Sequence, residues 1–163
     1  MNRFLPFLAL CAALSFHALP AAASSAPRND AAMPTEIMMV LGSDFGLFRK
    51  GEGGALTFER ANSFPLVPGQ AYGWVIRLQT EKKTVKWREE FTLPVKPETW
   101  GDPADYVSIS ADGRTAVVEK VVELKDGAIS NSWDMAPGDP KGKYVSRVWV
   151  EGQLIGTFEF EVR

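Results

Sequence analysis

The sequence predicts an all-β fold: an antiparallel sandwich of about eight strands. Short segments rich in β-branched and aromatic residues alternate with Gly, Pro and Asp at intervals of about ten residues, as in sandwiches and barrels. No stretch after residue 36 has a convincing helical period. No internal repeat or linker divides this part of the chain, so we expect one domain.

The first strands follow residue 36. Residues 37–41 form a compact apolar strand, and 46–49 continue the same edge after a turn predicted at 42–44. The Gly-rich stretch 51–54 is a second turn, and Leu56–Arg60 is the next strand.

Two longer strands supply the predicted core. Apolar residues occupy every second position of 72–80, and 85–93 repeats this period except at Glu89. We expect these two strands to pair as a hairpin whose inward faces bring Trp74 and Trp87 into the core.

Tight turns organise the second half of the chain. Asp112 and Gly113 predict a hairpin between Val107–Ile109 and a strand over 115–124. A second Asp-Gly pair at 126–127 ends that strand and precedes another over 129–133.

The clearest predicted hairpin is the last one. It joins 144–150 to 154–162 through a turn at Glu151 and Gly152. The apolar final strand is expected to be tied into a sheet.

The N-terminus is typical of a secretory signal. Arg3 precedes a mostly apolar run over 4–16, and the small residues 21–23 form a cleavage site, so we expect cleavage after Ala23. The alternative of a membrane anchor is disfavoured because the run is shorter than the roughly 20 residues needed to span a bilayer and contains Pro6. The predicted organisation is a signal peptide over 1–23, a flexible lead-in over 24–35 and the sandwich domain over 36–163.

Composition excludes several kinds of chemistry for the exported chain. The only cysteine, Cys11, and the only histidine, His17, lie in the predicted signal. We therefore expect no disulfide, no nucleophilic catalysis that needs His, no metal site built on His or Cys, and no cofactor. The whole chain has 18 basic and 20 acidic residues. Removing Arg3 leaves 17 against 20, or −3, and this balance does not support nucleic-acid binding. No later apolar run could span a membrane.

The segment 138–144 resembles the tyrosine corner of immunoglobulin-like domains, in which a tyrosine hydroxyl bonds nearby backbone. Gly142 and Tyr144 stand at the matching spacing, whereas Asp139 is one residue farther from the tyrosine than usual. Ser146 stands where an antibody domain carries its second cysteine. The resemblance implies an immunoglobulin-like sandwich.

Tyr72, Gly73, Trp74, Ile76, Arg77 and Leu78, with the 138–144 turn and the final hairpin, are similar to uncharacterised immunoglobulin-like domains of secreted proteobacterial proteins. This family resemblance implies a fold and a periplasmic or secreted location, and it carries no catalytic motif.

Two loops contain a candidate ligand site. Trp100 and Asp102 lie in one, and Trp133 and Asp134 lie in the other, so two aromatic rings and several carboxylates form a groove if the loops meet. The preferred alternative is that both indoles cover the core while the Asp residues stabilise turns. Calcium binding by the same Asp residues has no supporting ligand spacing.

The function predicted from these features is an exported, non-catalytic binding or accessory module for an envelope component or a protein partner. Pairing at an exposed strand edge is one expected mode. The alternatives are a hydrolase that uses carboxylates, an enzyme with an oxygen-ligated metal, and a structural domain or hydrolase inhibitor. Glu89 is one candidate carboxylate, since it interrupts an apolar face, although an edge position would also explain it.

Overall fold

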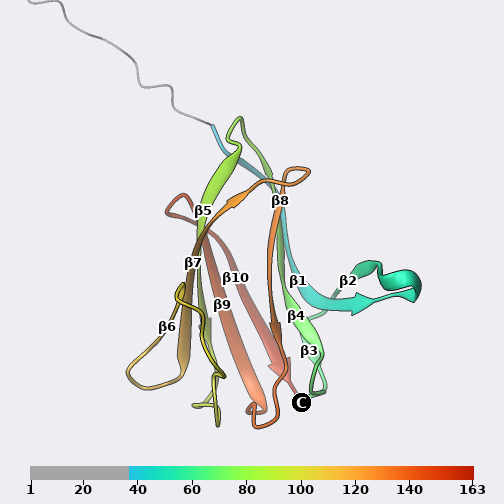
Figure 1. Ribbon diagram of the computed structural model, residues 1–163, viewed down its shortest axis with the longest axis vertical. Coiled ribbons are helices and arrows are strands. Elements are labelled where there is room, and N and C mark those ends of the chain that lie inside the picture. The colour runs from blue at the N-terminus through green and yellow to red at the C-terminus, as the bar shows by residue number, and fades with distance from the viewer. Residues whose placement is uncertain (1–36) are drawn as a thin grey trace, which may run out of the picture. The chain divides into compact units, whose positions relative to one another are not determined.

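The computed structural model describes residues 37–163, which fold as two mainly antiparallel sheets packed face to face (Figure 1). The predicted boundaries at 23 and 35 lie outside these residues. The elements are β1 (Met39–Lys50), η1 (Glu52–Gly54), β2 (Leu56–Arg60), β3 (Ser63–Phe64), β4 (Ala71–Gln79), β5 (Thr84–Thr92), β6 (Val107–Ile109), β7 (Thr115–Glu123), β8 (Ala128–Asp134), β9 (Gly142–Val150) and β10 (Gln153–Val162).

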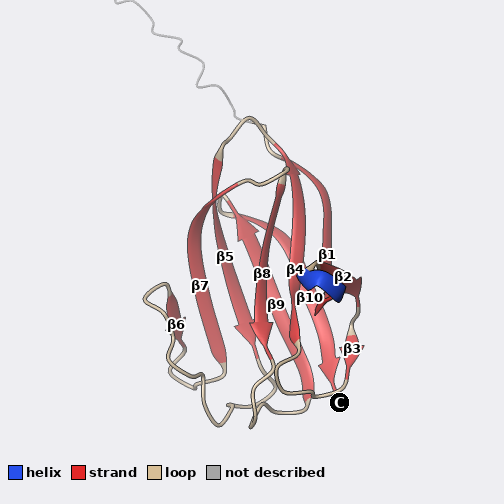
Figure 2. Cartoon of the chain, turned by 45° about the vertical axis from the view of Figure 1, so that its right-hand side comes forward, coloured by secondary structure: helices blue, strands red, loops and turns tan. Residues whose placement is uncertain are grey.

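One sheet has four strands in the order β2-β1-β4-β8, and the other has six in the order β3-β10-β9-β5-β7-β6 (Figure 2). This arrangement confirms the predicted all-β sandwich, with ten strands instead of eight. The two-residue strand β3 is too short to show a period in the sequence. No helix in the described range is long and apolar enough to span a membrane.

Alternation along β4 and β5 brings Trp74 and Trp87 into the core, where their rings meet edge to face with centroids 5.1 Å apart. The predicted hairpin between these strands is wrong, because β4 and β5 belong to different sheets and face each other across the core. Alternation identifies the inward side chains of a strand, and it does so equally for strands that pair and for strands that oppose each other.

Strand β1 is one continuous strand of 12 residues. The turn predicted at 42–44 is instead a register shift between Val40 and Gly42 against β4. A bulge of this kind adds a residue and bends the strand without ending it. Figure 1 shows the end of β1 curving away with β2 as a projecting hairpin.

Two glycines allow strands of the four-stranded sheet to approach closely. A Cβ on Gly46 would lie 2.0 Å from the Glu59 carbonyl oxygen, and one on Gly73 would lie 2.1 Å from the Asn131 carbonyl oxygen. Gly73 therefore sets how closely β8 packs against β4, and β8 carries Asn131 and Trp133.

Candidate functional site

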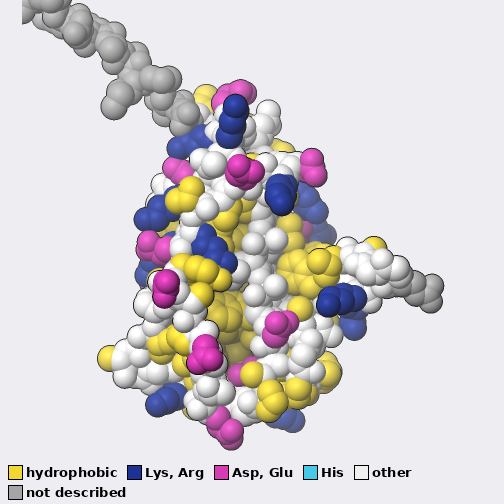
Figure 3. Space-filling model, in the orientation of Figure 1, with side chains coloured by type: hydrophobic (Ala, Val, Ile, Leu, Met, Phe, Trp, Pro, Cys, Tyr) yellow, Lys and Arg dark blue, Asp and Glu magenta, His cyan; other side chains and the backbone are white. Residues whose placement is uncertain are grey.

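The sandwich has two open sides, because neither sheet curls over to meet the other. The first, named the β7–β8 side, lies between β8 and the β6–β7 edge; the second, named the β1–β10 groove, lies between β1 and β10. Figure 3 shows apolar side chains at the bottom of a hollow on the face that it presents.

Trp100 and Trp133 do meet, with ring centroids 6.2 Å apart. Both pack against the core, and both indole N–H groups are already used. Trp100 donates to the Gly113 carbonyl at 2.8 Å, and Trp133 donates to the Glu89 carboxylate at 3.3 Å. Neither ring offers a free polar edge to a ligand, so this arrangement fits the alternative in which the indoles cover the core.

Asp102 and Asp134 are exposed, and their carboxylates make no hydrogen bond or ion pair with any residue in 37–163. Asp134 ends β8, and Asp102 lies in the loop between β5 and β6. Within the same range, no three His, Cys, Asp or Glu side chains are grouped so that they could hold a metal ion. The structure thus brings the two predicted aromatic rings together, and neither predicted carboxylate is bonded to them.

The turn before β9 holds a closed corner. The Tyr144 hydroxyl donates to the Pro140 carbonyl at 2.6 Å, and the Asp139 carboxylate accepts from the Ala136 N–H at 2.7 Å. Gly142 has φ 131°, which L side chains rarely adopt. Burial raises the pKa of Tyr144 above its ordinary value, which favours the protonated hydroxyl that donates to Pro140.

Glu89 lies at the centre of a polar cluster inside the core. It is fully buried on β5, between β9 and β7, so the edge position considered for it is wrong. Its carboxylate accepts hydrogen bonds from Asn131 at 2.7 Å, Ser146 at 2.7 Å and Trp133 at 3.3 Å. The donors come from both sheets, so the carboxylate joins β8 of one sheet to β9 of the other.

Burial raises the pKa of Glu89, while the hydrogen bonds from Ser146 and Asn131 oppose that rise by favouring the charged form. The nearby Trp74 indole also favours the charged form of Glu89 and so opposes the rise in its pKa. The buried Nε1 of Trp74 forms no hydrogen bond with a described residue. No cation pairs with Glu89 among the described residues. The sequence signal for this centre was the interruption of an apolar face at Glu89.

The raised pKa of Glu89 predicts a pH-dependent stability. The native state holds the proton more tightly than the unfolded chain, whose pKa is near the ordinary 4.5. The stabilisation from this group is therefore complete below that pH and is lost as pH rises through the higher native pKa. Compared with Glu89→Gln, which does not titrate, the wild type should lose unfolding free energy as pH rises above the ordinary 4.5 in urea denaturation series. A constant difference between the two proteins would show that Glu89 titrates normally.

A lysine occupies the β7–β8 side. Lys120 is paired with the buried Trp87 across β5 and β7, so its side chain points inward. Its Nζ lies 4.0 Å from the centroid of the Tyr106 ring and 5.7 Å from that of Trp87. The hollow there measures about 160 Å³, and the next hollow along β7 is framed by Glu123 and Lys125. Inward charges of this kind protect sheet edges from pairing with other chains.

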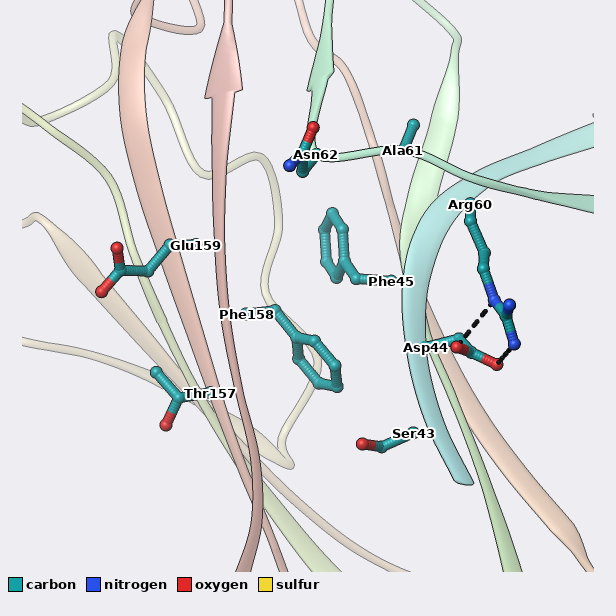
Figure 4. Close-up of a pocket in the computed structure, with 9 residues that line it drawn as sticks. All are labelled: Ser43, Asp44, Phe45, Arg60, Ala61, Asn62, Thr157, Phe158 and Glu159. Atoms are coloured by element: carbon teal, nitrogen blue, oxygen red, sulfur yellow. Dashed lines mark hydrogen bonds and ion pairs between the residues drawn. The ribbon is translucent and has the colours of Figure 1, made fainter. Parts of the chain in front are cut away.

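The β1–β10 groove has no such inward charge. It measures about 440 Å³ and is lined by Ser43, Asp44, Phe45, Arg60, Ala61, Asn62, Thr157, Phe158 and Glu159. Figure 4 shows Phe45 and Phe158 pointing toward each other between the two strands, with ring centroids 5.6 Å apart. The charged side chains lie outside: Glu159 points away from the groove, and Asp44 is bound by Arg60 at 2.8 Å.

Backbone groups along both edges of the groove are unpaired in the described part of the chain. Glu161 donates its N–H to Asn62, on the side of β10 away from β9, so by alternation the N–H and C=O of Thr157 and Glu159 point the same way. The Phe45 carbonyl accepts from Ala61, so the backbone groups of Ser43 also face outward from β1. The sequence led us to expect an exposed strand edge but did not indicate which strand would form it.

These features define an immunoglobulin-like β-sandwich with one protected and one unprotected open side. The sequence profile of the PM0630 beta sandwich domain family matches residues 43–163, and the chain belongs to this family. A comparison with curated proteins found no match.

Solved structures give the same fold class. An immunoglobulin-like protein (PA1606) from Pseudomonas aeruginosa is similar over 78% of this chain and 97% of its own, with 16% sequence identity and a TM-score of 0.53. The alkylpurine DNA glycosylase AlkC of Pseudomonas fluorescens, solved with DNA containing an abasic site analog, matches 74% of this chain and 30% of its own at 17% identity and a TM-score of 0.35. The first likeness supports the fold alone, and the second carries no inference about this chain.

Proposed function

We propose that the mature chain is exported to the periplasm or the medium, where it acts as a non-catalytic module that binds a partner protein in the β1–β10 groove. The signal-like N-terminus supports export. Cleavage after Ala23 would give a mature protein that begins at Ser24, and mass measurement of protein purified from the envelope and the medium tests this directly.

The observation that carries the binding role is the difference between the two open sides. Lys120 points into the β7–β8 side, whereas the inward residues at the edges of the groove include Phe45 and Phe158. A protein that only had to stay monomeric would be expected to protect both edges. Aromatic side chains beside unpaired backbone groups are what an interface needs for burial and for hydrogen bonding.

Photo-cross-linking from inside the groove tests this function. Phe158 is replaced by the photoreactive residue p-benzoylphenylalanine in cells, and adducts are identified by mass spectrometry. The matched control carries the same residue at Tyr106, an aromatic on the other open side whose side chain is 49% exposed. Position 158 should give an adduct with a specific envelope protein that position 106 does not give.

The identified partner is then purified and its binding measured. Phe158→Ser should weaken its affinity at least about tenfold, as expected for loss of a central interface aromatic, and Tyr106→Ser should leave it unchanged. No adduct from position 158, or the same adducts from both positions, would overturn the assignment of the groove.

A further inference from the structure

We propose, on the basis of the groove-binding function, that the partner supplies a short extended segment that pairs with the free edge of β10 and alternates apolar with basic residues. The segment would continue the six-stranded sheet in line with β3, which already pairs with the end of β10 in parallel.

The length of the free edge limits the added strand. At one end, β3 covers β10 from Glu161, and at the other a register shift between Leu154 and Gly156 interrupts the ladder with β9. Between these limits, Thr157 and Glu159 offer their backbone N–H and C=O groups to a new neighbour. The paired region is therefore about five residues long, which matches an ordinary short strand.

Space for this strand exists on both faces of β10. The groove lies on the inner face, and a second hollow of about 420 Å³ lies on the other, lined by Asn62, Lys143, Tyr144, Val145, Glu159, Phe160 and Glu161. The two hollows share Asn62 and Glu159. The edge is thus open from both faces, as an incoming strand requires.

Side chains along the edge set the chemistry of the segment. Inward positions of an added strand would meet Phe45 and Phe158, so they suit apolar residues. Outward positions would lie beside Glu159, which forms no ion pair with any described residue and stands opposite the uncharged Val145, and beside Glu161, which stands opposite Lys143. Asp44, in contrast, is already neutralised by Arg60 and Arg77. The charge without a basic neighbour is therefore that of Glu159, and it selects Lys or Arg at the outward position beside it.

Peptides test the pairing directly. The mature chain is used to select binders from a bead-displayed library of random seven-residue peptides, and the best binder is resynthesised with one N-methyl group at each backbone amide in turn. Strand addition predicts that every second methylation weakens binding at least about tenfold while those between have little effect, since only alternate N–H groups face β10. Loss without this alternation would overturn strand addition.

Charge reversal tests the selectivity. Glu159→Lys should shift the selected outward residues from basic to acidic, whereas the control Glu123→Lys, the same change at the exposed end of β7, should not. Selected peptides with no such preference would overturn the proposed chemistry.

The two proposals fail in different ways. If a peptide cross-links from position 158 but its N-methyl series shows no alternating loss of affinity, the groove function stands and the added strand is rejected. Peptides and partners that never cross-link from the groove would reject the function itself. Formation of a dimer in sedimentation experiments that buries β10 would show that a second copy fills the groove, and it would also overturn the proposal of a separate partner.

Discussion

Glu89→Ala should lower the free energy of unfolding by about 4 kcal/mol, because it removes the acceptor of a buried polar cluster and leaves a cavity. The side chains of Asn131, Ser146 and Trp133 would each keep a donor in the core without its present partner. Because these donors come from both sheets, the loss should loosen the packing of one sheet on the other. Urea denaturation followed by tryptophan fluorescence measures the change.

Two controls separate this effect from a general effect of mutation in β5. Glu89→Gln keeps an oxygen for Asn131 and Trp133 and can donate to Ser146, so it should cost less than about 1 kcal/mol at neutral pH. Glu90→Ala, on the outward face, removes only the partly exposed pair with Arg88 and should cost no more than about 1 kcal/mol. Equal stability of Glu89→Ala and wild type would show that the cluster does not hold the sheets together.

Gly73→Ala should destabilise the domain by about 3 kcal/mol or more, a large effect for a single methyl group. Its Cβ would lie 2.1 Å from the Asn131 carbonyl oxygen and 2.9 Å from the Ser132 Cα, and both are backbone atoms that cannot rotate away. Relief of this overlap requires β8 to move from β4, which would also move Asn131 away from Glu89. Thermal unfolding and the midpoint of urea denaturation report the change.

Gly42→Ala is the matched control on β1. The nearest atom to its Cβ would be a flexible Arg77 nitrogen at 3.8 Å, and its φ is not in the positive region. This change should be neutral or slightly stabilising, because alanine restricts the unfolded chain more than glycine does. If Gly73→Ala were as well tolerated as Gly42→Ala, the close approach of β8 to β4 would not be required for stability.

The fold class was predictable because the alternation of apolar and polar side chains along a strand can be recognised without knowing which strands pair with it. Alternation in 72–80 and 85–93 identified Trp74 and Trp87 as core residues, and both are buried. It could not say whether two inward faces lie side by side in one sheet or opposite each other in two, so the pairing of β4 with β5 was wrong. Sheet assignment depends on contacts between residues far apart in the chain, which local patterns do not encode.

The candidate site was harder to predict for the same reason. The sequence identified Trp100 and Trp133 as candidate residues. It could not predict that their N–H groups donate to Gly113 and Glu89. The β1–β10 groove arises from two strand edges that are distant in sequence, and an unpaired edge leaves no residue pattern of its own. The inward position of Lys120, in contrast, could be recognised in the sequence, because this lysine interrupts an otherwise apolar face of β7.

The most direct measurement is amide hydrogen exchange of β10 by NMR, on the mature protein alone and with its selected peptide. In the free protein, the amides of Thr157 and Glu159 should exchange much faster than those of Phe158 and Phe160, which face β9, and the peptide should slow them selectively. Thr157 and Glu159 amides that are already protected in the free protein, or that stay fast in the complex, would contradict an open edge that pairs with a partner strand.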